Sequence, residues 1–305
     1  KTYLTLQAAK ALVSFESGIE SLEKKLNDQI CQVQFHPGFG YEDFIDGLKP
    51  VLEKNGSVNL KLATGIFKIF CIKATYALKD FRKNNKTSDD KKNKKEPPKY
   101  YFIVDEINRA ELSAVLGETL SCLEKDKRLD FDADGNLIEG LAIDSQNSYL
   151  ITNQEDAVYT DNTNRRLFGS PSNIVFIGTM NDIDRSVDTF DFALRRRFTW
   201  VYKGFDEDVL FGCDELSELD FDVVEDYVSS AKSLNRYISK DLGLGRSYEI
   251  GHAYFMEVSV FGGTVKIDNL FKQHLAPLLE EYLRSEYSTK EIEGKINEAK
   301  NKFLG

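Results

Sequence analysis

Continuous and alternating apolar runs mark the strands in the first part of the chain. The run from Tyr100 to Val104 is apolar throughout and rich in β-branched and aromatic residues, which is typical of a strand buried on both faces of a parallel sheet. A second run of this kind extends from Asn173 to Gly178. From Ile30 to Phe35 apolar and polar residues alternate, which predicts a strand with one covered face. We therefore expect an α/β protein with a parallel sheet.

Helical spacing is found in the segments that flank these strands. Residues 3–15 carry apolar residues three and four positions apart, namely Leu4, Ala8, Leu12 and Phe15. A charged connection is expected at 23–28, and a turn at 37–40 leads into a helix that begins near Tyr41 with an acidic first turn. Residues 112–123 place their leucines on one helical face. Strand, polar tip and helix thus recur along the chain.

The remaining segments differ in composition. Residues 79–99 are rich in Lys, Asn, Ser and Asp, which predicts a basic, mobile insertion; a solvated loop is favoured over contact with a phosphate backbone. Residues 129–170 contain short alternating stretches, such as 147–151, that are broken by turn signals, which favours hairpins inserted into an α/β core. From 205 to 305 the pattern is helical, so we place a domain boundary near Gly204.

Composition excludes several classes of protein. The chain has 305 residues, 41% of them hydrophobic, and a net charge of −10, which is the balance of a soluble globular protein. No apolar stretch reaches the roughly 18 residues that span a bilayer, and no signal-peptide layout is present, so we expect a cytoplasmic protein without membrane contact. The acidic surface would repel nucleic acid, so any anion site must be local. The dispersed cysteines and histidines indicate reduced thiols and no zinc site.

Two adjacent carboxylates, Asp105 and Glu106, follow the most apolar strand. In nucleotide hydrolases with a phosphate loop, the acidic residue at this place holds Mg²⁺ and a neighbouring glutamate polarises the attacking water. Capping of the following helix is the alternative interpretation of the pair. A phosphate loop before this strand would decide in favour of the nucleotide site.

The chain opens with Lys1-Thr2, directly before the first predicted helix. A phosphate loop of the form G-x-x-x-x-G-K-[ST] ends in the same way, and no complete copy of that motif occurs in the sequence. We therefore expect that the chain begins inside the motif and omits the first strand and the glycines. A chance beginning at these residues is the alternative.

A series of short motifs extends over nearly the whole chain. They are, in order, Val33 to His36, Tyr41 to Phe44, Ile103 to Ala110, Gly117-Glu118, Glu124 to Arg128, Ile177 to Asn181, Asp184 to Ser186, Ala193 to Phe198, Ile250 to Phe255 and Ala276 to Tyr282. In this order they resemble the McrB branch of AAA+ motor proteins. The resemblance implies an α/β fold, the AAA+ P-loop three-layer sandwich with a parallel central sheet, at residues 1–204. A C-terminal helical lid domain would follow at 205–305.

The resemblance also implies roles for individual residues. Lys1 and Thr2 would contact the β- and γ-phosphates, and Thr2 and Asp105 would hold the magnesium ion. Glu106 would activate water, and Asn181 would help to orient that water. A turn residue at a strand end is the alternative role for Asn181.

The run Arg195-Arg196-Arg197 places three guanidinium groups side by side, which repel each other unless an anion or carboxylates gather them. At a subunit boundary, Arg196 or Arg197 would act as an arginine finger on the γ-phosphate of a neighbour, an effect worth roughly 10³ in rate. Ion pairing with acidic residues of the same chain is the alternative; the candidates are Asp184, Asp188 and Asp191.

The McrB branch uses GTP and carries an M-N-x-x-D signature. Here Asn181 and Asp184 match this signature, whereas Asp182-Ile183 replaces the usual Thr-Ala pair. We expect Mg²⁺ and GTP as cofactors, with ATP as the alternative nucleotide. Arg246 would be the phosphate sensor of the lid domain, with a surface arginine as the alternative.

The implied function is that of a GTP- or ATP-hydrolysing hexameric ring in a modification-dependent DNA restriction system, a form of anti-phage defence. Such a ring would translocate or remodel DNA and activate an McrC-like nuclease subunit. The alternative is a nucleotide-dependent assembly scaffold with slow hydrolysis. The acidic charge indicates that a DNA-reading module is not among these residues.

Overall fold

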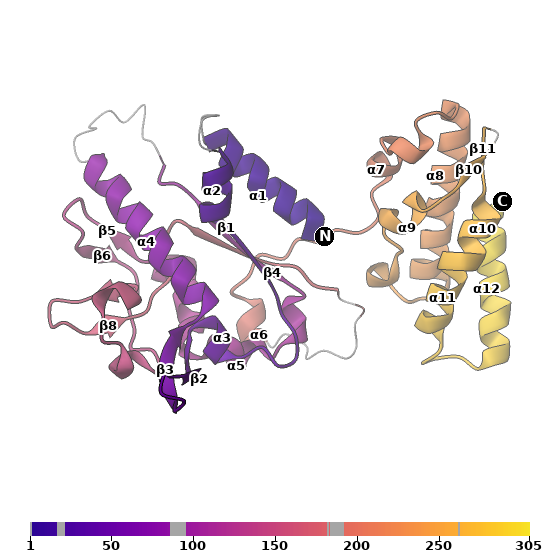
Figure 1. Cartoon of the computed structure of the whole chain (residues 1–305). Helices are drawn as coiled ribbons and strands as arrows, with labels where there is room; N and C mark the ends of the chain where they lie inside the picture. The colour runs from indigo at the N-terminus through magenta and orange to yellow at the C-terminus, as the bar shows by residue number, and fades with distance from the viewer. Residues whose placement is uncertain (1, 17–21, 86–95, 182, 184–191, 262) are drawn as a thin grey trace. The chain divides into compact units, whose positions relative to one another are not determined.

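The computed structural model of the chain describes residues 2–16, 22–85, 96–181, 183, 192–261 and 263–305. The chain divides into two compact units, Lys1–Thr199 and Trp200–Gly305 (Figure 1). Each unit has its own hydrophobic core. The middle of the predicted basic insertion, 86–95, lies outside the described residues.

A parallel sheet forms the centre of the first unit. Its strand order is β1 (Ile30–Gln34), β4 (Tyr100–Asp105) and β9 (Ile174–Gly178). Gln34 pairs with Asp105 and Val104 pairs with Gly178, so the carboxyl ends of the strands lie side by side. The middle strand, β4, is buried up to its last residue. The predicted parallel sheet with a fully buried strand is confirmed.

Helices cover both faces of this sheet. Successive strand residues point to opposite sides, and β4 has apolar residues on each side that must be buried. Tyr101 and Ile103 pack with α1 on one face, and Phe102 and Val104 join the larger core on the other face. The first face receives α1 (Thr2–Glu16) and α2 (Leu22–Gln29), and the second receives α3 (Tyr41–Phe44), α4 (Ile66–Asn84) and α5 (Leu112–Leu116). The first unit is therefore the expected three-layer α/β sandwich.

The helix α1 is apolar on two sides. Ala9 and Val13 form its buried side, with 1% and 0% exposure. Leu4, Leu12 and Phe15 instead expose 54%, 49% and 93% of their surface. The predicted helix is present, but the apolar stripe that predicted it faces away from the core.

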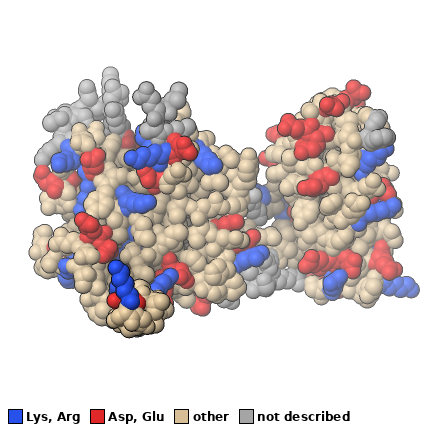
Figure 2. Space-filling view, in the orientation of Figure 1, with Lys and Arg blue, Asp and Glu red and all other residues tan. Residues whose placement is uncertain are grey.

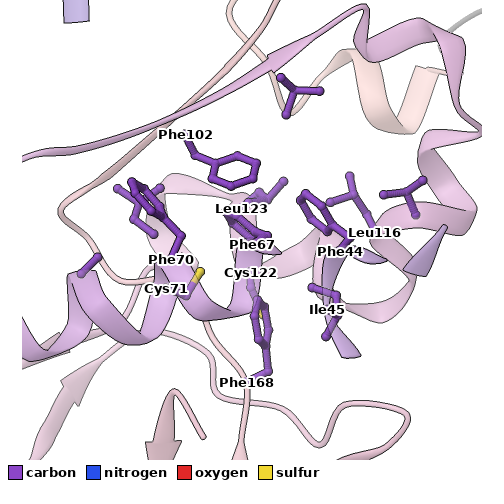
Figure 3. Close-up of a cluster of buried hydrophobic side chains, with 14 of the residues drawn as sticks. Phe44, Ile45, Phe67, Phe70, Cys71, Phe102, Leu116, Cys122, Leu123 and Phe168 are labelled. Carbon is purple, nitrogen blue, oxygen red and sulfur yellow. The ribbon is translucent and has the colours of Figure 1, made fainter. Parts of the chain in front are cut away.

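Phenylalanine side chains from several elements form the centre of the larger core (Figure 3). The ring centroids of Phe44 and Phe67 lie 4.6 Å apart, and those of Phe67 and Phe102 lie 4.9 Å apart. Phe102 in turn stacks on Phe176 of β9 at 5.7 Å. Aromatic pairs contribute about 0.5–1.5 kcal/mol each beyond the area that they bury. This cluster therefore fixes β4 and β9 against α3 and α4.

The segment 112–123 is not the single helix that we predicted. The helix α5 ends before Gly117, and the 3-10 helix η3 (Gly117–Leu123) follows it. Gly117 has a φ of +51°, and a Cβ atom at this position would lie 3.3 Å from the ring of Tyr41. With a ψ of −135°, this backbone conformation lies outside the helical region and is accessible mainly to glycine, which explains the break.

Two shorter predictions also differ from the structure. The expected connection at 23–28 belongs to α2, in which Leu26 packs onto the sheet while Glu23, Lys24 and Asp28 are exposed. The alternating stretch at 147–151 contains the 3-10 helix η5 (Ser148–Leu150) in place of a strand.

Hairpins project from the α/β core. The longest consists of β2 (Asp46–Leu52) and β3 (Val58–Thr64), lies between α3 and α4, and was not predicted. Two short hairpins lie within 129–170: β5 (Asp130–Phe131) with β6 (Leu137–Glu139), and β7 (Tyr159–Thr160) with β8 (Arg166–Leu167). The other elements of this unit are η2 (Ile107–Arg109), η4 (Lys125–Lys127), η6 (Gln154–Asp156) and α6 (Phe192–Arg195).

The second unit is mainly helical. Its longest helices, α8 (Phe221–Arg236) and α12 (Thr289–Leu304), pack together around Tyr227, Phe255 and Phe303. The other elements are α7 (Glu207–Phe211), η7 (Asp214–Leu216), η8 (Tyr237–Asp241), η9 (Arg246–Tyr248), α9 (His252–Met256), β10 (Val260–Phe261), β11 (Thr264–Val265), α10 (Ile267–Leu270), η10 (Phe271–Leu275) and α11 (Ala276–Leu283).

The surface carries side chains of both charges (Figure 2), and the cysteines form no disulfides with each other. On the face drawn in Figure 2, Lys and Arg side chains lie among Asp and Glu side chains, without one continuous basic patch. Within the described part of the chain, no helix is both long and apolar enough to cross a membrane. All four cysteines are free, and burial raises the pKa of Cys122 to about 12, so this thiol stays protonated at neutral pH.

Candidate functional site

Three hydroxyl and carboxylate side chains meet at the carboxyl edge of the sheet. Asp105 is the last residue of β4, Thr179 follows β9, and Thr2 begins α1. The Thr2 hydroxyl donates a hydrogen bond to Asp105 Oδ1, and the Thr179 hydroxyl donates to the same atom at 2.5 Å. The two hydroxyl oxygens lie 3.4 Å apart. Parallel register thus brings Asp105 and Thr179 together, although they are 74 positions apart in sequence.

Glu106 leaves the strand in an unusual backbone conformation. Its φ and ψ of 51° and 47° lie in the left-handed region, which costs a residue other than glycine about 1–3 kcal/mol. Its Oε2 atom is buried without a hydrogen bond and lies 3.3 Å from Arg109 Nε. Backbone strain and a buried carboxylate oxygen without a hydrogen bond often coincide with function.

Asn108 joins this turn to the end of the neighbouring strand. Its side chain is buried, with 7% exposure, and its Nδ2 donates to the carbonyl oxygen of Asn181 at 3.2 Å. The amide of Ile107 donates to the carbonyl of Thr179 at 2.9 Å. Asn108 belongs to one of the sequence motifs, but an asparagine after a strand is an ordinary turn residue, so the sequence alone gives no sign of this contact.

Of the other predicted residues, Asn181 follows β9, and its own side chain is exposed. The link through Asn108 brings it beside the loop that carries Glu106. Lys1 and Asp184 lie outside the described residues, so their predicted roles remain predictions.

The side chains of the arginine run differ in their exposure and in their contacts. Arg197 Nε donates to Glu124 Oε1 at 2.7 Å, and the Arg197 side chain is 15% exposed. Arg196, by contrast, is exposed. Asp184, Asp188 and Asp191, the acidic partners that we considered, lie outside the described residues; Glu124 is a partner that we did not consider.

Arg246 lies in the second unit. Its guanidinium carbon is 4.9 Å from the centroid of the Tyr202 ring, and the Tyr202 hydroxyl donates to the Arg246 carbonyl at 2.6 Å. The following segment is fixed by buried Asn235, which donates to the carbonyl of Ile250 and accepts from its amide. Arg246 therefore sits on a firmly held turn, with its side chain exposed over an aromatic ring.

The oxygen donors at the sheet edge suit the implied magnesium ion. Mg²⁺ binds oxygen ligands and usually takes one or two carboxylates, with phosphate oxygens and water in the remaining positions. Asp105 and the Thr2 hydroxyl supply such a partial set. Among the residues described, no group of three or more His, Cys, Asp or Glu side chains is placed to hold a metal ion. The site therefore fits an ion that arrives with a phosphate ligand.

A parallel sheet with these side chains at its carboxyl edge, followed by a helical unit, is the architecture of an AAA domain with its lid. The family model of the AAA domain of the dynein-related subfamily matches residues 17–198, and the model of the alpha-helical lid domain of McrB matches 226–291. The chain therefore belongs to the AAA family, as an McrB-like member.

One curated relative is the type IV methyl-directed restriction enzyme EcoKMcrB subunit of Escherichia coli K12. The two sequences are 35% identical over 268 residues, which is 85% of this chain and 48% of the relative. The chain thus spans about half the length of this relative. A crystal structure from Cytophaga hutchinsonii is 11% identical, covering 97% of this chain and 78% of that one, with a TM-score of 0.28, too low to establish a shared fold.

Proposed function

We propose that the chain is the nucleotide-hydrolysing core of an McrBC-like restriction motor. The observation that carries this proposal is the hydrogen-bonded cluster of Thr2, Asp105 and Thr179, with strained Glu106 next to it. The E. coli relative, a subunit of a methyl-directed restriction enzyme, supports the system in which such a motor would act.

The proposed division of labour follows from the side chains at the sheet edge. Lys1 and Thr2 bind the β- and γ-phosphates, and Thr2 and Asp105 orient the metal ion. Bound Mg²⁺ supplies charge that stabilises the transferring phosphoryl group. Glu106 accepts the proton of the attacking water, and Asn181 helps to orient this water. Arg246 acts as the phosphate sensor of the lid.

GTP is the proposed nucleotide, because Asn181 and Asp184 match the signature of the McrB branch. Steady-state hydrolysis of GTP and ATP by the full-length natural protein, with Mg²⁺ and with kcat/KM as the readout, tests this preference. An equal or higher kcat/KM for ATP would assign ATP in its place. Turnover that stays slow with an McrC-like nuclease subunit and DNA present would favour the assembly scaffold.

We also propose a hexameric ring in which an arginine reaches a neighbouring nucleotide. The exposure of Arg196 supports it as the finger, and the ion pair with Glu124 supports a role for Arg197 within its own subunit. A finger acts on the active site next door, whereas an internal ion pair serves only its own chain.

Mixed rings separate these two roles. Combining Arg196→Ala and Glu106→Gln subunits should raise turnover above the sum of the separate variants, because intact Arg196 then faces an intact Glu106. Combining Arg197→Ala with Glu106→Gln should give no such rise. The measurement is nucleotide turnover at fixed total protein and varied subunit ratio. Rescue by Arg197→Ala but not by Arg196→Ala would reverse the two assignments.

A further inference from the structure

Two backbone turns carry the residues proposed to act on the attacking water. Glu106 lies in the turn after β4, and Asn181 follows β9. The turns are joined below these residues by the amide of Ile107, which donates to the carbonyl of Thr179. This backbone link and the buried side chain of Ile107 anchor the first residue of η2, and a further contact holds the next residue.

Asn108 supplies that contact. Its Nδ2 donates to the carbonyl oxygen of Asn181 at 3.2 Å, whereas its Oδ1 is buried without a hydrogen bond. A buried amide with an unsatisfied acceptor is uncommon in folded proteins and costs stability. The hydrogen bond of this buried side chain leads to the turn that carries Asn181.

The same turn also holds the carboxylate of Glu106. Arg109 lies next to Asn108 on η2, and its Nε is 3.3 Å from Glu106 Oε2. A rotation of η2 would therefore move Arg109 and redirect the Glu106 carboxylate. The bond from Asn108 to the Asn181 carbonyl opposes this rotation.

We propose that Asn108 is a positioning residue that sets the direction of Glu106 relative to Asn181. This inference rests on the proposed nucleotide hydrolysis at the same site. Asn108 does not touch the phosphates in this assignment; it acts through η2 and Arg109. Its loss should slow the chemical step and leave nucleotide binding almost unchanged, since Thr2 and Asp105 are held by other bonds.

The chain offers a matched control in Asn173, at the opposite end of β9. Asn173 is fully buried, and its Nδ2 donates to the carbonyls of Ala74 and Pro98 at 3.0 Å each. Its Oδ1, like that of Asn108, is buried without a hydrogen bond. Substitution of Asn173 therefore removes the same kind of contact far from Glu106 along the strand.

The test compares Asn108→Ala and Asn108→Asp with Asn173→Ala and Asn173→Asp in the full-length natural protein. For both Asn108 variants we expect kcat to fall about 10- to 100-fold, because small misplacements of a catalytic group have effects of this size. KM and the affinity for a fluorescent nucleotide should change less than about twofold. The Asn173 variants should lose thermal stability and keep the kcat of the folded protein.

The variant Asn108→Asp keeps the shape of the side chain and places an acceptor opposite the Asn181 carbonyl, so it tests the hydrogen bond when Asn108→Ala folds poorly. Unchanged kcat in a folded Asn108 variant, while Glu106→Gln abolishes turnover, would overturn the positioning role. Absence of turnover in the wild-type protein would instead count against nucleotide hydrolysis.

Amide hydrogen exchange tests whether Asn108 holds η2 in place and needs no measurement of enzymatic activity. Faster exchange at Ile107 and Arg109 in Asn108→Ala, but not in Asn173→Ala, is expected; equal exchange in both would contradict the coupling.

Discussion

Replacing Glu106 by glutamine should suppress nucleotide hydrolysis about 10²- to 10⁴-fold, the contribution that a general base typically makes. Glutamine keeps the length and shape of the side chain but cannot accept the proton of the attacking water. Nucleotide affinity should remain within a few-fold of the wild-type value, because Thr2, Asp105 and Thr179 keep their hydrogen bonds. The variant should accumulate as a nucleotide-loaded assembly.

The fold should tolerate this substitution. Glutamine enters the left-handed conformation at a cost similar to that of glutamate, and the lost ion pair with Arg109 is partly exposed, so the free energy of unfolding should change by about 1 kcal/mol or less. Glu111→Gln makes the same chemical change at an exposed position shortly after the turn and is the control. Wild-type turnover by Glu106→Gln at saturating nucleotide and Mg²⁺ would remove Glu106 from its proposed role.

The middle strand of the sheet could be predicted because burial on both faces leaves a direct trace in sequence. The run from Tyr100 to Val104 has no polar interruption, which is typical of the middle strand of a covered parallel sheet. The carboxylates that follow it then fall at the sheet edge by geometry alone. Parallel pairing with β9 brings Thr179 to the same edge, because Thr179 follows its strand just as Asp105 ends β4.

The packed face of α1 could not be predicted in the same way. Apolar residues line two sides of this helix. Hydrophobic periodicity identifies an apolar side but does not tell which of two such sides packs against the sheet. The stripe with Leu12 and Phe15 is as regular as the buried side with Ala9 and Val13. Small residues on the buried side allow close approach to the sheet, a property that hydrophobic spacing does not report.

Contacts between distant polar residues left no trace in the pattern either. Asn108 is a residue type found in many turns, and the residue that it bonds to, Asn181, lies 73 positions further along the chain. Glu124 and Arg197 are likewise 73 positions apart. Such pairs depend on the assembled fold, so they become visible only in three dimensions.

Lys68 is the clearest example of a polar contact that the sequence pattern does not reveal, and we expect a large effect when it is replaced. It lies on α4 beside Phe67, with 1% exposure, and its Nζ forms an ion pair with Asp46 Oδ2 at 2.6 Å. Asp46 begins the β2–β3 hairpin and is fully buried. Further contacts to Asp46 come from the 129–170 region: Asn147 Nδ2 donates to its carbonyl at 3.1 Å, and the Ser145 hydroxyl lies 3.5 Å from Oδ2.

Removing one partner of this ion pair should strongly destabilise the first unit. Lys68→Met leaves the Asp46 carboxylate buried without a counter-charge, and its Oδ1 already lacks a hydrogen bond. The expected loss in the free energy of unfolding is about 3–5 kcal/mol, measured by denaturant unfolding. Lys49→Met is the control, because Lys49 pairs with Asp43 at 3.0 Å with both side chains at least 40% exposed, and its loss should cost at most about 1 kcal/mol.

The double variant Asp46→Leu with Lys68→Met distinguishes the cost of an unpaired charge from the value of the pair itself. Taking two charges out of water costs as much as their attraction returns, so apolar replacement of both partners is often neutral or stabilising. We therefore expect the double variant to be more stable than Lys68→Met alone. A double variant less stable than Lys68→Met would mean that the pair stabilises the fold by itself, through its contacts to the hairpin and the 129–170 region. A Lys68→Met variant as stable as Lys49→Met would contradict the expected cost of leaving the Asp46 carboxylate without its counter-charge.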